Sequence, residues 1–100
     1  MTTKPTRPSP QPRDSEQAGE RSWTRRSVLQ WTTDFFTQND LESARLDAEV
    51  LLAHVLEQER LALYLHYEDT VPGSALQAYR RLIRRRVNRE PIAYITGMRE

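Results

Sequence analysis

Cysteine is absent from the 100-residue sequence, glycine occurs only three times, and no apolar run approaches the length of a membrane span. Without cysteine the chain has no disulfide, no thiolate metal ligand and no thiol nucleophile, and a cytoplasmic location is expected. A helix that crosses a membrane needs about 18 or more apolar residues in succession, so no membrane contact is expected. The scarcity of glycine also excludes a glycine-rich loop that could cradle phosphate groups.

The two histidines, His54 and His66, do not form a recognisable metal site. Neither has a second histidine three or four residues away, and no cysteine can complete a ligand set. No nucleophile is matched to a general base either. The residues by themselves therefore predict a small domain without a catalytic, cofactor or metal site.

Residues 1–22 hold four of the six prolines and no aromatic residue. Because so little apolar surface cannot offset the entropy lost on ordering, the sequence predicts a disordered leader over 1–22. The acidic residues Asp14, Glu16 and Glu20, together with the lack of an apolar run, argue against a secretory signal.

Helical periodicity begins directly after this leader. Thr24 is the expected N-cap of a helix that runs to about Gln38, because its hydroxyl can accept from the free amides of the first turn. The apolar stripe of this helix, at helical spacing, consists of Val28, Leu29, Trp31, Thr32, Phe35 and Phe36. The spacing predicts one face packed on a core.

The segment 43–56 is apolar almost all round the helix axis, which predicts a central helix covered on several sides. Asp40 or Ser43 is expected to cap its start through a side-chain oxygen. The helix also carries Asp47 and Glu49, and an enclosed carboxylate is costly unless a cation or a donor meets it. Both acids therefore require partners elsewhere in the chain.

A helix is also expected from residue 75, with Ser74 as its N-cap. Arg86 falls inside the apolar stripe of this helix, which is formed by Leu76, Tyr79, Leu82, Ile83 and Val87. An arginine at that position is suited to an inward carboxylate, so the sequence predicts a structural ion pair between Arg86 and either Glu49 or Asp47.

The stretch 60–67 fits both a strand and a short helix. A helix is preferred, because the one available strand partner is 92–96 and an isolated pair of strands is marginally stable. Pro91 is expected to end one helix or open another, and Gly97 to cap the last turn. The predicted fold class is all-α, a bundle of four to five helices over 23–96, with 97–100 starting a linker.

Charge is distributed unevenly along the chain. Residues 23–73 carry four arginines against nine acids, whereas residues 74–100 carry seven arginines against two acids. The arginine-rich helix from Arg80 to Arg89 could bind phosphates, which leaves open a free-standing helical adaptor or RNA-binding module. A solvated helix face is the preferred interpretation, since no exposed aromatic is interleaved with the arginines and the rest of the folded part is acidic. Nucleic acid is therefore not the expected partner.

Two segments together resemble a known family. Leu46-Asp-Ala-Glu-Val-Leu-Leu-Ala-His-Val-Leu56 is followed some thirty residues later by Arg84-Arg-Arg-Val-Asn-Arg-Glu-Pro-Ile-Ala-Tyr-Ile-Thr-Gly97. The combination resembles the N-terminal domain of release factor glutamine methyltransferases, and the second segment is the more specific. The resemblance covers about residues 23–100. One departure is Glu57, where the family often has glycine.

The resemblance implies a substrate-recognition domain that precedes an S-adenosylmethionine-dependent methyltransferase domain. That enzyme methylates the glutamine of the Gly-Gly-Gln loop of peptide-chain release factors. The family's Asn-Pro-Pro-Tyr motif and cofactor loop do not occur in this sequence, so it implies no catalytic or cofactor residue here. Exposed acids are expected to attract the release factor, namely Asp34, Glu42, Glu57 and Glu59. The junction with the catalytic domain is expected at Glu90, Pro91, Tyr94 and Gly97.

Overall fold

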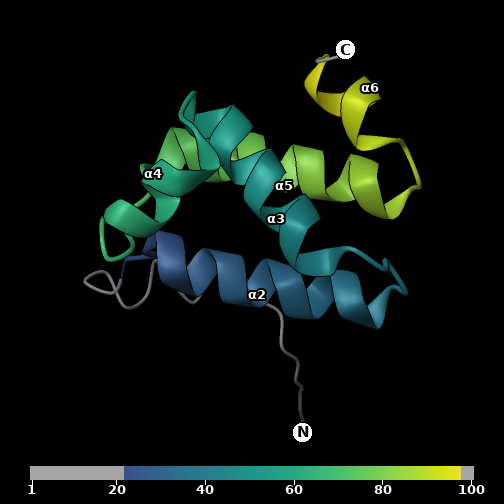
Figure 1. Ribbon diagram of the computed structural model, residues 1–100, viewed down its shortest axis with the longest axis horizontal. Helices are drawn as coiled ribbons and strands as arrows, with labels where there is room; N and C mark the ends of the chain where they lie inside the picture. Colours follow the sequence, from purple (N-terminus) through teal and green to yellow (C-terminus); the bar gives the residue numbers. More distant parts are fainter. Residues whose placement is uncertain (1–21, 98–100) are drawn as a thin grey trace, which may run out of the picture.

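The computed structural model describes residues 22–97, in which five helices form one bundle (Figure 1). The helices are α2 (Arg25–Gln38), α3 (Ala44–Leu56), α4 (Arg60–Leu65), α5 (Gly73–Val87) and α6 (Ile92–Thr96). The all-α fold is thereby confirmed. The predicted leader over 1–22 and the predicted linker over 97–100 lie outside the described residues, apart from Ser22 and Gly97.

Helix α3 is the hub, because it packs against α2, α4, α5 and α6 (Figure 1). The largest fully enclosed side chains of the core are Leu29, Thr32, Phe36, Leu51, Leu52, Leu63 and Tyr79. The prediction that α3 is covered on several sides is correct, but one side remains open, since Leu46 is 46% exposed. Figure 1 shows α2 along one side of α3, with α4 and α6 well apart.

Helix α2 starts as predicted at Thr24. The Thr24 hydroxyl accepts from the amide of Ser27 at 3.0 Å, and the Ser27 hydroxyl accepts from the amide of Thr24 at 2.9 Å, which completes a capping box. The next amides, of Arg25 and Arg26, donate to the carbonyls of Asp69 and Tyr67 at 3.0 Å. The loop before α5 therefore satisfies the start of α2.

The start of α3 differs from the prediction, whereas its end at Leu56 agrees with it. Ser43 is the N-cap residue, but neither it nor Asp40, which has a φ of 64°, gives α3 a side-chain capping bond. At the other end Glu57 adopts the left-handed conformation, with φ 57° and ψ 47°. The amide of Gln58 then donates to the carbonyl of Ala53 at 3.0 Å, which is a Schellman turn made without glycine.

The ambiguous stretch at 60–67 forms a helix, as preferred. Leu63 is enclosed, whereas Leu61 and Leu65 on the opposite side are 65% and 69% exposed. Among residues 22–97 the backbone pairs in strand fashion only at the isolated bridge between Thr24 and Thr70.

Helix α5 begins two residues earlier than predicted, so the assignment of Ser74 as its N-cap is wrong. Pro72 is the N-cap, because its extended backbone directs its carbonyl to the amide of Leu76 at 2.9 Å. Pro91 opens α6 in the same way, and Gly97 closes it with a φ of 72°, as expected.

Candidate functional site

Asp47 and Glu49 are the two buried carboxylates of α3. Because they are two residues apart, about 200° of helix rotation separates them, and they face different neighbours. Asp47 faces α5 and Glu49 faces α4. The polar chemistry of the bundle is organised around these two groups.

Asp47 pairs with Arg86. Nε of Arg86 lies 3.0 Å from Oδ2 of Asp47, and the two side chains are only 21% and 8% exposed. The same guanidinium donates from Nη1 to the carbonyl of Glu90 at 3.0 Å, which joins α3, α5 and the turn before α6. Of the two acids considered from the sequence, the structure brings Asp47 to Arg86 and directs Glu49 elsewhere.

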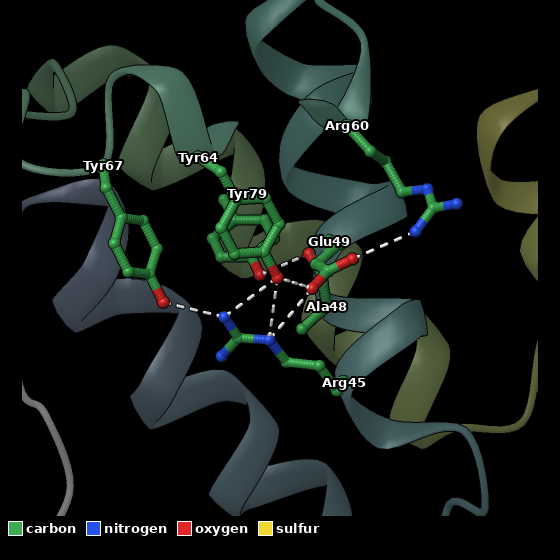
Figure 2. Close-up of polar contacts among 7 residues, drawn as sticks. All are labelled: Arg45, Ala48, Glu49, Arg60, Tyr64, Tyr67 and Tyr79. Atoms are coloured by element: carbon green, nitrogen blue, oxygen red, sulfur yellow. Dashed lines mark hydrogen bonds and ion pairs between the residues drawn. The ribbon is translucent and has the colours of Figure 1, made fainter. Parts of the chain in front are cut away.

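Glu49 is the centre of a second cluster (Figure 2). Its Oε2 accepts from Nε of Arg45 at 2.9 Å and from the Tyr64 hydroxyl, while its Oε1 accepts from Nη1 of Arg60 at 3.1 Å. Nη2 of Arg45 also donates to the hydroxyls of Tyr64 and Tyr67, at 3.1 and 2.8 Å. These contacts fasten α4 to α3.

The protonation equilibria reflect this geometry. Burial alone would raise the pKa of Glu49, but hydrogen bonds from Tyr64, Arg45 and Arg60 outweigh it and hold the pKa below its ordinary value. Burial, assisted by the hydrogen bond to Glu49, raises the pKa of Tyr64. Burial would lower the pKa of Arg45, yet its bonds to Tyr64, Tyr67 and Glu49 raise it. The cluster is therefore fully charged at neutral pH, with a tyrosine that remains a donor.

Every polar group at the centre of the Glu49 cluster is used to hold another one. A phenol with a raised pKa stays protonated at neutral pH, so Tyr64 is not available as a general base. The Glu49 carboxylate already accepts three hydrogen bonds, from Tyr64, Arg45 and Arg60. Within residues 22–97 no group of three or more metal-ligating side chains comes together. The arrangement therefore suits fixing the position of α4 rather than catalysis.

The sequence interpretation missed the Glu49 cluster, although one signal was available. Arg45 and Glu49 are four residues apart on one helix, which is the spacing of a helical ion pair. Arg60 and Tyr64 could not be assigned in advance, because their contacts depend on the direction in which α4 leaves α3. Arg25 was also missed; it is 8% exposed and donates from Nη1 to the carbonyl of Ala62 at 3.0 Å.

All four acids expected to attract a partner are exposed, and none makes an ion pair within the described part of the chain. Asp34 accepts from the Gln30 amide at 3.2 Å on α2. Glu42 precedes α3, whereas Glu57 and Glu59 follow it. Because the 13 residues of α3 span about 20 Å, these acids form two separate groups rather than one patch.

The residues expected at a domain junction lie together at the corner between α5 and α6 (Figure 1). Glu90 pairs with Arg85 at 2.8 Å, and Pro91 and Gly97 bracket α6. Tyr94 is 74% exposed, so its ring lies largely at the surface of this corner.

The arginine-rich helix has two kinds of arginine. Arg85 and Arg86 make ion pairs, and Arg89 donates to the carbonyl of Asn39 at 2.9 Å. The remaining arginines are exposed and make no ion pair within residues 22–97, namely Arg80, Arg81 and Arg84. In that same part of the chain, no helix has the length and apolar character to cross a membrane.

Comparison with known proteins places this bundle among the helical domains found in methyltransferases. The chain is 41% identical over 86 residues to a release factor glutamine methyltransferase of Rhodopirellula baltica, and 40% identical over 78 residues to one of Geobacter sulfurreducens. It is 31% identical over 75 residues to a bifunctional methyltransferase of Rickettsia conorii. Residues 27–97 match the family described as the PrmC N-terminal domain, and the chain belongs to that family.

These matches cover most of the chain but a small part of each relative. They include 86%, 78% and 75% of this chain, against 29%, 28% and 14% of the three relatives in the same order. The chain thus spans less than a third of their length. No solved structure gave a significant match.

Proposed function

We propose that this chain is the substrate-recognition domain of a methyltransferase that modifies the glutamine of the Gly-Gly-Gln loop in peptide-chain release factors. The carrying observation is that nearly the whole described bundle, residues 27–97, matches the N-terminal domain of that family. In this proposal residues 23–96 are the recognition domain, and 97–100 begin the connection to a C-terminal methyltransferase domain.

The proposed role is positioning. Holding a large protein so that one loop reaches an active site converts an encounter between two molecules into a local one, which can supply several kcal/mol of the barrier reduction, on the order of 7 or more in favourable cases. Such a role requires a rigid support. The Asp47–Arg86 pair and the Glu49 cluster fix α4, α5 and α6 against α3 and thereby support it.

Electrostatic attraction would assist docking. The exposed acids Asp34, Glu42, Glu57 and Glu59 make no ion pair with any residue of 22–97, so they attract a basic surface over a distance of about 8–10 Å at physiological salt. A protein loop that works against ribosomal RNA is expected to have basic surroundings. We therefore assign these acids to the early encounter with the release factor in the cytoplasm.

The described residues do not fit S-adenosylmethionine, the cofactor of the proposed enzyme. The buried carboxylates that could meet a ribose are both bound by arginines, and no glycine-rich turn leads into a helix. The cofactor is accordingly assigned to the methyltransferase domain. Calorimetry of the 100-residue chain with S-adenosylmethionine should show no binding heat.

A domain exchange tests the proposal. The N-terminal domain of the R. baltica enzyme would be replaced by residues 1–97, and methylation of a release factor would be compared with methylation of a short Gly-Gly-Gln peptide. We expect the chimera to retain a KM for the release factor within about tenfold of the parent, while deletion of the domain raises that KM and leaves the peptide reaction unchanged. A chimera that behaves like the deletion would overturn the proposal.

The alternative is an RNA-binding module, which is favoured by the exposed Arg80, Arg81 and Arg84, since they make no ion pair in the part of the chain that the structure describes. Three phosphate contacts would give a slope of roughly −2 to −3 in a plot of log K against log salt concentration. Titration of labelled RNA at several salt concentrations would detect it. Submicromolar, salt-dependent binding without any effect in the domain exchange would support the alternative.

A further inference from the structure

Helix α4 displays two leucines to solvent. Leu61 and Leu65 are 65% and 69% exposed, and because they are four residues apart they lie on one side of the helix. Leu63 faces the opposite way into the core. Single exposed leucines are common, but two on adjacent turns form an apolar ridge, here named the α4 ridge (Leu61 and Leu65).

The helix that carries the α4 ridge is fixed to α2 and α3 by hydrogen bonds. Arg25 of α2 donates to the carbonyl of Ala62, and Arg60 and Tyr64 of α4 both donate to the Glu49 carboxylate of α3. Figure 2 shows Tyr64 and Arg60 directed toward Glu49 from either side of its carboxylate. A ridge fixed in this way loses little conformational freedom when a partner binds, which favours affinity.

Acids border the α4 ridge at both of its ends. Glu57 and Glu59 precede α4 and make no ion pair within residues 22–97. Glu68 and Asp69 follow α4 and are exposed, with Glu68 paired to the exposed Arg26. The nearest arginine, Arg60, is directed to Glu49. A surface of this kind is complementary to an apolar recess surrounded by lysine or arginine.

None of the residues that the structure describes covers the α4 ridge, since Leu61 and Leu65 are 65% and 69% exposed. The described chain ends after α6, and Figure 1 shows α6 and α4 on opposite sides of the bundle. A following domain attached there would meet the α6 corner, where Tyr94 is exposed, before it could reach α4. The relatives are more than three times as long as their matched parts, so such a domain is large.

We infer that the α4 ridge is the contact that holds the release factor, with Leu61 and Leu65 seated in an apolar recess that basic side chains surround. The inference rests on the proposed function and specifies its docking face. The α6 corner is left to the methyltransferase domain.

The test is binding of the 100-residue chain to a purified bacterial release factor by calorimetry. The double variant Leu61→Ser/Leu65→Ser should weaken binding at least about tenfold, because apolar anchors in a recess dominate such contacts. Tyr94→Ser is the matched control, an exposed apolar side chain on the other side, and should change the dissociation constant less than about twofold. Since the leucines are exposed, the thermal unfolding midpoint of the double variant should stay within a few degrees of that of the unmodified chain. The single variants Leu61→Ser and Leu65→Ser provide a second set of binding measurements.

Each outcome is decisive. Binding that the double and single variants leave unchanged would overturn the inference and spare the proposed function. No binding by the unmodified chain, together with a failed domain exchange, would overturn both. A larger loss with Tyr94→Ser would place the contact at α6. Self-association that the double variant abolishes in sedimentation would make the α4 ridge a contact between copies of the chain and overturn the inference.

Discussion

The two buried carboxylates of α3 are equally enclosed, at 8% exposure of each side chain, yet they are neutralised in different ways. Asp47 meets Arg86, which is itself largely buried at 21% exposure. Glu49 meets Arg45 and Arg60, whose side chains are 35% and 51% exposed. The Asp47–Arg86 pair is therefore enclosed in the bundle, whereas the arginines that bind Glu49 are in contact with water.

The Asp47–Arg86 pair joins two helices of the core, α3 and α5, whereas the Glu49 cluster joins α3 to the more exposed helix α4. Removing one partner of an enclosed pair leaves an uncompensated charge in the core, which is strongly destabilising. Removing one partner of a solvent-screened pair is much less costly. The Asp47 pair should therefore control unfolding of the whole bundle, and the Glu49 cluster should control the attachment of α4.

The largest effect is expected at the inner pair. Arg86→Met leaves Asp47 buried without a cation, and should lower the free energy of unfolding by about 3 kcal/mol. Adding Asp47→Asn should restore part of that loss, because no charge then remains enclosed. Urea unfolding of the four proteins in a double-mutant cycle measures the coupling. A coupling free energy near zero would mean that the Arg86 guanidinium is solvated by water rather than paired with Asp47. The two carboxylates would then not differ in how they are neutralised.

A smaller and more local effect is expected at the outer cluster. Glu49→Gln should lower the free energy of unfolding by about 1–2 kcal/mol, between the values for exposed and buried pairs. Amide hydrogen exchange should accelerate in Leu63 and Leu65 before it does in Leu51, because α4 opens first. Glu59→Gln, which removes an exposed acid without an ion pair, is the control. Uniform acceleration across α3 and α4 would show that both links serve the core alike.

The pH dependence sharpens the same comparison. The pKa of Glu49 lies below its ordinary value of about 4.3, so its stabilisation is complete above that value and is lost as the pH falls through the folded-state pKa. The difference in unfolding free energy between the unmodified chain and Glu49→Gln should therefore be full at pH 7 and should decrease progressively once the pH falls below the ordinary carboxyl pKa. Urea titrations at stepped pH would check it. A difference that does not change as the pH is lowered from 7 through the acid range would point to packing rather than charge.

The smallest effect is expected at Glu57, in the turn that connects α3 and α4. Glu57 has a φ of 57°, which strains any residue with a Cβ, so Glu57→Gly should stabilise the chain by about 0.5–1 kcal/mol. Glu57→Gln keeps the Cβ and removes only the charge, so it should leave stability nearly unchanged. Thermal unfolding of both variants decides between the two contributions. A larger gain from glutamine would show that charge, and not backbone strain, limits this turn.

Helix existence followed from the sequence, because apolar spacing and caps are local. Thr24, Pro91 and Gly97 act at helix ends as the pattern predicted. The short helix α4 was correctly preferred by elimination, since a strand would have lacked a sheet. The start of α5 was missed by two residues because Pro72 and Ser74 are both acceptable caps, and only the backbone direction distinguishes them.

The partners of charged residues were harder to predict. The need of Asp47 and Glu49 for cations followed from their helix, but six arginines lie in the segment from Arg80 to Arg89 alone, and helix crossing decides which one arrives. The exposure of Leu61 and Leu65 was likewise hidden, because either side of so short a helix could have faced the core. Such assignments depend on tertiary geometry that periodicity does not contain.

Tyr79 adds a constraint that apolar packing lacks. Its ring is fully enclosed between α5 and α3, and its hydroxyl donates to the carbonyl of Ala48 at 2.8 Å. Leucine contacts tolerate sliding of one helix along another, whereas a hydroxyl that reaches one carbonyl does not, because a shifted position would leave it buried and unbonded. The Tyr79 hydrogen bond therefore selects one axial alignment of α3 and α5, whereas apolar contacts alone would allow several.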